Sequence, residues 1–133
     1  MIRVSAVVLR NSSGAVLTVR KRGTQRFMFP GGKPESGETA LETAIRECGE
    51  ELCLQLDAPD LALLGVFRAA AANEPGLDVE ATVFTCAGVV ESRPGTITPA
   101  AEIAELRWQS LGDAPLPDDL APLLAKCVFP LLT

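Results

Sequence analysis

The clearest pattern along the chain lies between Thr39 and Leu54, where apolar residues recur at the three- and four-residue spacing of an α-helix. The recurring positions form one apolar face and are Leu41, Ala44, Ile45, Cys48 and Leu52. Thr39 and Glu42 make a T-x-x-E capping box in front of this run. The box predicts that the helix begins at Ala40.

Strand-like runs lie on both sides of this helix. Two short runs, Val4–Leu9 and Ala15–Val19, are rich in valine and are separated by the turn cluster of residues 11–14, so they predict a β-hairpin. Two longer runs, Leu61–Ala70 and Val79–Val90, follow the helix and are joined by the polar loop Asn73–Gly76. Such a loop either only connects its strands or takes part in substrate selection.

The last third of the chain adds one strand and one helix to the prediction. Residues 91–101 are rich in Pro, Gly and Thr and are expected to be irregular, and Ile103–Gln109 reads as a strand that carries Trp108. Pro117–Leu124 predicts a second helix with Pro117 near its first turn. Strands mixed with two helices indicate an α/β (α+β) fold.

Composition limits the classes of protein that fit. The chain has 133 residues, which suits a single domain over positions 1–133, and 47% of them are hydrophobic. The net charge of −5 argues against a protein that coats nucleic acid, which would need a basic patch. A small anionic ligand still fits, because bound cations can invert the local field.

The sequence has no histidine, which excludes Ser-His triads and histidine metal ligands. The four cysteines form no C-x-x-C pair, so they are expected to be free thiols in a reducing cytoplasm. The first ten residues do not resemble a signal peptide, and no apolar run approaches the ~20 residues that span a bilayer. A cytoplasmic protein without a membrane partner is therefore expected.

The predicted helix also carries an acidic face. Glu47, Glu50 and Glu51 lie at i, i+3 and i+4, so their carboxylates share one side of the helix. A solvated acidic surface is one interpretation. The other is a Mg²⁺ site, because hard divalent cations bind carboxylate oxygens, and Arg46 is placed to orient the cluster. The preceding Gly31–Gly32 pair would let the backbone approach a ligand closely.

These residues together resemble the Nudix box, G-x5-E-x7-R-E-U-x-E-E-x-G-U, in which U is a bulky aliphatic residue. Gly32, Glu38 and the run from Arg46 to Leu54 match its glycine and its charged positions at the right spacing. Two positions depart from it. Cys48 stands at an aliphatic position, and Cys53 stands where the family has glycine, at the left-handed turn after the helix.

The resemblance implies the Nudix fold, a mixed β-sheet between helices, and hydrolysis of a nucleoside diphosphate linked to another moiety with Mg²⁺ or Mn²⁺. It implies that Glu47, Glu50 and Glu51 bind metal, that Glu47 is the first choice for general base, and that Arg46 orients them. The carbonyl of Gly31 or Gly32 would complete the site, and Glu38 would stabilise the loop before the helix. A further ligand would come from Glu102 or Glu105, and spacing does not choose between them.

Substrate contacts are expected from the basic residues Lys33, Arg20 and Lys21, with Arg22 and Arg26 nearby, although exposed cations can also be simply solvated. Phe27 is expected to line the pocket and Phe29 to lie in the core. The segment Phe29–Lys33 resembles the family branch that acts on nucleoside triphosphates, including oxidised ones. The expected partner is therefore a small nucleotide and not a nucleic acid, and a homodimer stays open.

Two other functions are compatible with a Nudix fold. A non-catalytic nucleotide sensor would have an incomplete acidic set, whereas the set here is complete and no DNA-binding module is attached. Isomerisation of a prenyl diphosphate would need additional acid–base groups that the box does not contain. A fold alone does not decide between these activities.

Overall fold

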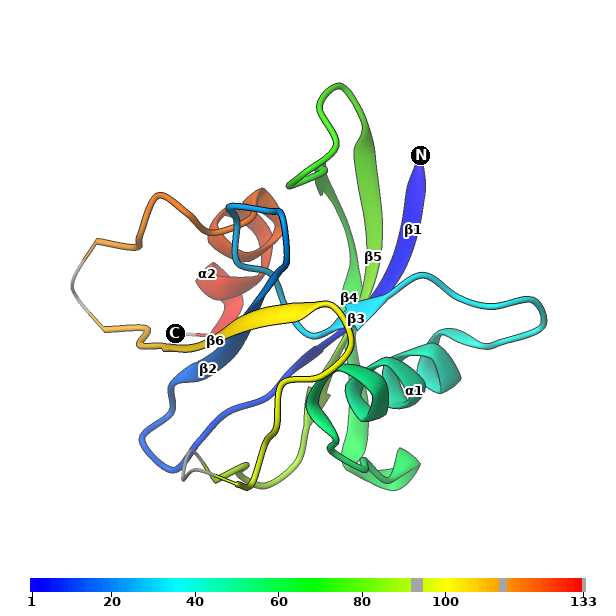
Figure 1. The fold of residues 1–133 in the computed structure, drawn as a ribbon, viewed down its shortest axis with the longest axis vertical. Helices are drawn as coiled ribbons and strands as arrows, with labels where there is room; N and C mark the ends of the chain where they lie inside the picture. Colours follow the sequence, from blue (N-terminus) through cyan, green and yellow to red (C-terminus); the bar gives the residue numbers. More distant parts are fainter. Residues whose placement is uncertain (92–94, 113–114, 133) are drawn as a thin grey trace.

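The computed structural model describes residues 1–91, 95–112 and 115–132. Its centre is a four-stranded mixed sheet with the order β3-β1-β5-β4, as Figure 1 shows. Strands β1 (Ile2–Val8) and β5 (Asp78–Cys86) run parallel, whereas β3 (Gly31–Gly32) and β4 (Leu61–Ala70) run antiparallel to their neighbours. A two-stranded ribbon of β2 (Val16–Lys21) and β6 (Ile103–Gln109) packs beside this sheet.

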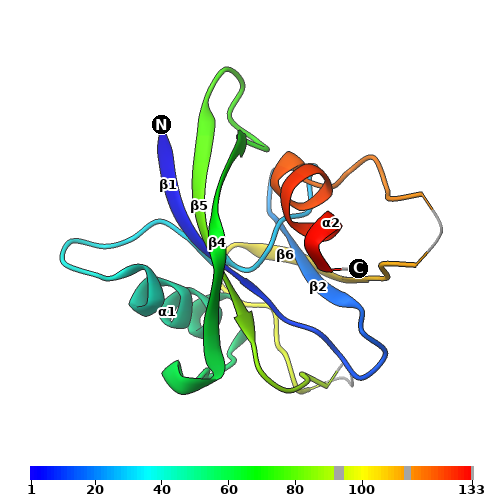
Figure 2. The ribbon, with the colours of Figure 1, turned by 180° about the vertical axis from the view of Figure 1, so that it is seen from behind.

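Helices cover both faces of the central sheet (Figures 1 and 2). Helix α1 (Ala40–Leu52) lies on one face, and the C-terminal helical segment lies on the other. This segment is a π-helical stretch, η2 (Leu123–Val128), that continues into α2 (Phe129–Leu132), and a 3-10 turn, η1 (Ala58–Asp60), precedes β4.

The side chains of β1 point alternately to the two faces of the sheet and contribute to two separate core clusters. Ala6 and Val8 point toward the C-terminal helical segment, whereas Val7 packs with the apolar face of α1. Successive strand residues point to opposite faces, so a run that is apolar at every position needs cover on both sides. The continuous apolar run at residues 6–8 of β1 is therefore explained by helices on both faces, and the predicted α+β class and mixed sheet between helices are confirmed.

The predicted start of α1 is confirmed. The Thr39 hydroxyl accepts a hydrogen bond from the Glu42 N–H at 3.1 Å, and the Glu42 carboxylate accepts one from the Thr39 N–H at 2.9 Å. This reciprocal pair satisfies donors that the helix itself leaves free. On the inner face, Ala44, Cys48 and Leu52 are fully buried, so Cys48 fills its aliphatic position as a small apolar residue.

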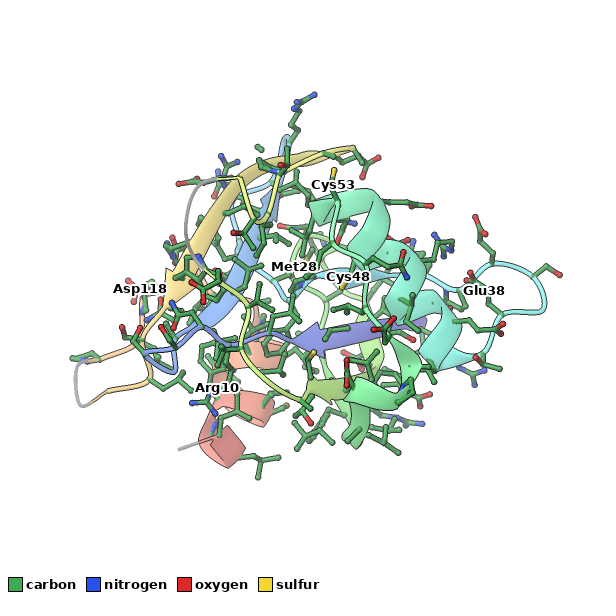
Figure 3. All side chains as sticks on the ribbon, turned by 90° about the horizontal axis from the view of Figure 1, so that it is seen from below. Arg10, Met28, Glu38, Cys48, Cys53 and Asp118 are labelled. Carbon is green, nitrogen blue, oxygen red and sulfur yellow. The ribbon has the colours of Figure 1, made fainter. Side chains whose placement is uncertain are left out.

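Helix α1 ends in a left-handed turn at Cys53, whose φ is 54°. The Cys53 N–H donates to the Gly49 carbonyl at 3.1 Å, and the Leu54 N–H donates to the Cys48 carbonyl at 3.4 Å. Figure 3 shows Cys53 at the end of the helix and Cys48 beneath it, and the Cys53 side chain is exposed. The turn that is usually built with glycine is therefore kept here with a cysteine.

Replacing Cys53 with glycine is expected to leave the free energy of unfolding unchanged or to raise it by up to about 1 kcal/mol, because a side chain in the left-handed region is strained. Part of the gain is offset by the larger backbone entropy of glycine in the unfolded chain. Urea denaturation of Cys53→Gly measures this, with Cys53→Ala as the control that keeps the Cβ atom. A clear loss of stability in the glycine variant alone would refute the strain argument.

The predicted hairpin of the first two strands is wrong. The chain turns at residues 11–14, but β1 and β2 join different sheets, and only an isolated bridge between Arg10 and Val16 links them. The partners of β1 are β3 and β5, which lie much further along the chain. The two adjacent apolar runs therefore predicted the presence of the two strands but not which strands they pair with.

Two further elements differ from the prediction by more than two residues at one end. Strand β5 ends at Cys86 instead of Val90, because the Ala87 N–H turns away to the Asp60 carbonyl and Gly88 takes a positive φ of 78°. The helix predicted at Pro117–Leu124 is also misplaced, since the helical segment begins at Leu123. The chain before it makes a turn at Asp118–Asp119 and a β-bridge at Leu120, because its backbone pairs with Phe27.

The four cysteines are free, as expected. In the part of the chain that the structure describes, no helix is long and apolar enough to cross a bilayer.

Candidate active site

A cavity of about 820 Å³ opens between the second half of α1, the glycine strand β3 and the C-terminal helical segment. The charged half of its lining contains Lys21, Lys33, Arg46, Glu47, Glu50, Glu51 and Glu102, and Glu35 and Glu74 also line the cavity. The other half is mostly apolar and contains Ile2, Val4, Met28, Phe29, Ala70–Ala72, Val79, Leu123 and Leu124. The cavity therefore joins a site for charged groups to a site for an apolar ring or chain.

Gly31 and Gly32 are required because neighbouring atoms lie too close to their backbone to leave room for a side chain. A Cβ atom on Gly31 would collide with the backbone carbonyl of Ser5, and Gly31 has a φ of 153°. A Cβ atom on Gly32 would lie 2.5 Å from the Cδ atom of Glu47. The missing side chains therefore let β3 pair with β1 and let the Glu47 carboxylate lie against the backbone at the cavity wall.

Glu51 is a buried carboxylate, with 4% of its surface exposed. Its Oε1 atom accepts a hydrogen bond from the Gly31 N–H at 3.0 Å. Burial raises the pKa of Glu51 to about 7, although the Gly31 N–H and the charge of Lys21 oppose this shift. A carboxylate held in this way is stabilised by any cation that reaches it.

Arg46 links the loop before α1 to the acidic face. Its guanidinium donates to Glu38 at 2.6 Å, to Glu47 at 3.0 Å and to Glu50 at 3.3 Å. It also donates to the backbone carbonyl of Lys33 at 3.0 Å. The structure thus places Arg46 where it holds the loop and orients two of the three predicted metal ligands.

Glu38 fastens the loop to the helix, and Figure 3 shows it at the N-terminal end of α1. Its carboxylate accepts hydrogen bonds from Arg46, from the Glu35 N–H at 2.8 Å and from the Thr43 hydroxyl at 2.9 Å. The Arg46 hydrogen bond is the largest cause that lowers the pKa of Glu38 to about 2. These contacts agree with a structural role for Glu38.

Replacing Glu38 with glutamine is expected to lower stability in a pH-dependent way. A carboxylate whose folded pKa is depressed contributes stability that is present above its unfolded pKa of about 4.5 and is lost as the pH falls through about 2. The difference in urea midpoint between parent and Glu38→Gln should therefore be constant above pH 5 and shrink below pH 4.5. Glu74→Gln, in an exposed loop, is the control; a difference that does not change with pH would refute the ionic contribution.

The other two glutamates of the acidic face differ in exposure. The side chain of Glu47 is 16% exposed and that of Glu50 is 53% exposed. Burial raises the pKa of Glu47 above its usual value, and the Arg46 hydrogen bond opposes this rise. The three carboxylates therefore line one cavity but do not share one environment.

The chemistry of these side chains fits a divalent cation. In the described ranges, no three Asp, Glu or Cys side chains already converge closely enough to hold a metal ion, and Arg46 occupies oxygens of Glu47 and Glu50. However, the available donors are all oxygens, as Mg²⁺ and Mn²⁺ prefer, and Glu51 is a buried carboxylate that accepts a backbone N–H and interacts with the charge of Lys21. The residues that would hold the ion are Glu47, Glu50, Glu51 and the carbonyl of Gly31.

The structure distinguishes the two further acidic candidates by position. Glu102 lines the cavity, whereas Glu105 lies on β6 and pairs with Arg20 at 3.1 Å. The loop that presents Glu102 is fixed to the end of α1, because the Ala100 N–H donates to the Glu51 carbonyl at 2.9 Å. Ala101, with a φ of 53°, makes the turn that brings Glu102 to the cavity.

The predicted basic residues also differ in whether they line the cavity. Lys21 and Lys33 line the cavity. Arg20 is held by Glu105 and the Thr24 carbonyl, and Arg26 donates to the backbone carbonyls of Asp118 and Leu120. Of the predicted phosphate contacts, the structure thus brings the two lysines, and not Arg20, to the charged half of the cavity.

Phe27 does not line the cavity, so its predicted position is wrong. It is 3% exposed and packs in the core, with the guanidinium of Arg107 3.8 Å above its ring. Phe29 is also buried, as expected, and its edge faces Phe129. The neighbouring Met28, which the sequence pattern did not single out, reaches the cavity instead.

Sequence reasoning missed the apolar half of the cavity. Its residues come from β1, from the segment before β3, from the end of β4, from the start of β5 and from η2, and of these only Phe29 belongs to a segment that the sequence pattern singled out. Isolated aliphatic residues are ordinary core residues in a sequence, so no local signal marks them as cavity walls. They become recognisable only when the fold brings Val4, Ala70 and Leu124 together.

The fold and the cavity define a small α+β protein with a glycine strand, a carboxylate-bearing helix and an apolar compartment beside it. The family model described as the NUDIX domain matches residues 1–130, and the chain belongs to the Nudix hydrolase family.

Two relatives and one solved structure illustrate the similarity. An RNA pyrophosphohydrolase of Halorhodospira halophila is 39% identical over 62 residues, which are 47% of this chain and only 33% of that protein. A protein of Bacillus subtilis described as a candidate 8-oxo-dGTP diphosphatase is 31% identical over 83% of this chain and 67% of its own length. The MutT protein of Methanosarcina mazei Go1 superimposes with a TM-score of 0.67 at 24% identity, over 89% of this chain and 86% of that one.

Proposed function

We propose that this Nudix hydrolase cleaves a nucleoside triphosphate, including oxidised forms, to a nucleoside monophosphate and pyrophosphate with Mg²⁺ or Mn²⁺. The observation that carries the proposal is the division of one cavity into a half with Glu47, Glu50, Glu51 and two lysines and an apolar half beside it. A nucleotide has the same division, with phosphates at one end and a base at the other. The relative described as an 8-oxo-dGTP diphosphatase supports the triphosphate class.

The size of the cavity agrees with this substrate. Ligand sites for small molecules occupy roughly 300–1,000 Å³ and are lined mainly by apolar groups with a few polar ones, and the cavity measures about 820 Å³. In the apolar half, Met28 and Leu124 can contact the faces of a planar base. Asn73 lies at the rim of this half and offers both a donor and an acceptor to the edge of a base.

The roles proposed for the charged half follow from position. Lys21 and Lys33 would bind phosphate oxygens, and Arg46 would hold Glu47 and Glu50 in place. Glu47 would accept the proton of the attacking water, because its carboxylate lies at the cavity wall with one oxygen oriented by Arg46. A divalent ion, when bound by Glu47, Glu50, Glu51 and the Gly31 carbonyl with Glu102 nearby, neutralises phosphate charge and lowers the pKa of bound water.

The test is phosphate and pyrophosphate release from a panel of nucleoside triphosphates, oxidised triphosphates, dinucleoside polyphosphates and nucleotide sugars, with and without Mg²⁺. We expect Mg²⁺-dependent release of pyrophosphate and a monophosphate from one or more triphosphates. Cleavage confined to nucleotide sugars would correct the substrate class. Tight binding of one nucleotide without any cleavage would replace the enzyme by a nucleotide sensor.

A further inference from the structure

Two segments far apart in the sequence form the walls of the apolar half of the cavity, and they are joined at one point. The Phe27 N–H donates to the Asp119 carbonyl at 2.8 Å, and the Ala121 N–H donates to the Phe27 carbonyl at 2.9 Å. These bonds make a parallel bridge between Phe27 and Leu120. Met28 and Phe29 continue from one side of this bridge into the cavity, and Ala121, Leu123 and Leu124 continue from the other.

Arg107 of β6 fastens this bridge from outside the cavity. Its guanidinium donates to both oxygens of the Asp119 carboxylate, at 2.7 and 2.6 Å, and lies 3.8 Å above the ring of Phe27. One arginine therefore contacts both joined segments. A planar guanidinium suits this task because it can form a paired hydrogen bond and stack on a ring at once.

Arg26 adds a second side-chain support to the bridge. It donates to the backbone carbonyl of Asp118 at 3.1 Å in an exposed position and to that of Leu120 at 3.2 Å in a part-buried one, and Figure 3 shows Asp118 on the side of the molecule away from Glu38. The wall beyond it is a π-helical stretch, η2, that begins two residues after Ala121. The placement of η2 over the cavity therefore depends on where Asp119 and Leu120 are held, together with its own packing in the core.

We infer that Arg107 and Asp119, acting with Phe27 as a clamp, set the spacing of the two cavity walls and so position the base of the substrate, without touching the reacting phosphates. The inference rests on the proposed function, because it takes the apolar half as the base site. Arg107 and Asp119 are positioning residues. Their loss should weaken binding of a nucleotide and leave the charged half unchanged.

The test compares Arg107→Lys and Asp119→Asn with the parent on the best triphosphate found. Either variant should raise KM by about tenfold, because a coupled contact is lost, whereas kcat at saturation stays within about twofold. Inhibition by inorganic pyrophosphate, which has no base, should not change. The matched controls are Arg68→Lys and Glu80→Gln, another arginine–carboxylate contact between strands, outside the cavity, and both should keep parental KM.

A double variant separates the clamp from two independent effects. Arg107→Lys with Asp119→Asn should raise KM no more than either change alone, because both remove the same contact. Thermal melts first establish that each variant is folded at the assay temperature. An unchanged KM, or an equal loss of triphosphate and pyrophosphate binding, would overturn the inference while the proposed activity stands; a parent that neither binds nor cleaves nucleotides would overturn both.

Discussion

Replacing Glu51 with glutamine is expected to lower turnover by about 100-fold or more, because it removes a charge contact from the phosphoryl-transfer site. Glutamine keeps the size of the side chain and an oxygen that can accept the Gly31 N–H. The fold should therefore survive, and at pH 8 the variant should even resist urea better than the metal-free parent, because a buried charge has been removed. Turnover at saturating Mg²⁺ and urea midpoints at the same pH measure the two effects.

Two further variants define the site of this effect. Glu50→Gln should also lower turnover by about 100-fold, because the Glu50 carboxylate is expected to hold the ion as well. This should hold although the Glu50 side chain is 53% exposed. Glu42→Gln, on the same helix, should keep parental turnover, since its carboxylate caps the Thr39 N–H at the helix start. Parental rates in all three variants would show that the metal site is wrongly assigned.

Millimolar Mg²⁺ or Mn²⁺ is expected to stabilise the protein, and more so at pH 8 than at pH 5. An ion that binds only the folded state adds about 2.7 kcal/mol at 100 times Kd, which corresponds to roughly 10 °C in Tm for a chain of this size. The pH dependence comes from Glu51, whose folded pKa of about 7 lies above the ordinary glutamate value of 4.5 because the carboxylate is buried. Without metal, the stability linked to this group is present below pH 4.5 and is lost as the pH rises through 7.

Thermal melts in EDTA and in each ion, at pH 5, 6, 7 and 8, measure this dependence. The parent in EDTA should lose Tm between pH 5 and 8 relative to Glu51→Gln, whereas added Mg²⁺ should restore it. A calorimetric titration with Mg²⁺ at pH 8 gives the affinity independently. Identical midpoints with and without metal, together with no heat of binding, would contradict a metal site on this helix.

The sequence predicted the parts of the structure that local chemistry determines. The capping box at Thr39 and Glu42 and the apolar face of α1 both depend on neighbours within a few residues, and both are found. The same holds for the direction of the acidic face, because helical spacing alone places Glu47 and Glu51 on one side. The match to the Nudix box then supplied the fold around them.

The parts that the sequence did not predict depend on distant partners. Strand β1 looked like half of a hairpin, but its hydrogen bonds go to Gly31–Gly32 and to β5. Phe27 looked like a pocket residue because it precedes the glycines, yet the stacking Arg107 comes from 80 positions further along and keeps it in the core. The helix expected from Pro117 starts late for the same reason, since the backbone at Asp119 bonds to Phe27.

The two adjacent glycines of β3 impose different limits on sequence variation. At Gly31 any side chain meets the backbone of Ser5, which cannot move without separating β3 from β1, so substitutions there should disappear from a variant library selected only for folding. At Gly32 the obstacle is the carboxylate of Glu47, a side chain that can swing away. Alanine at Gly32 should therefore survive selection for folding and be lost only under selection for activity.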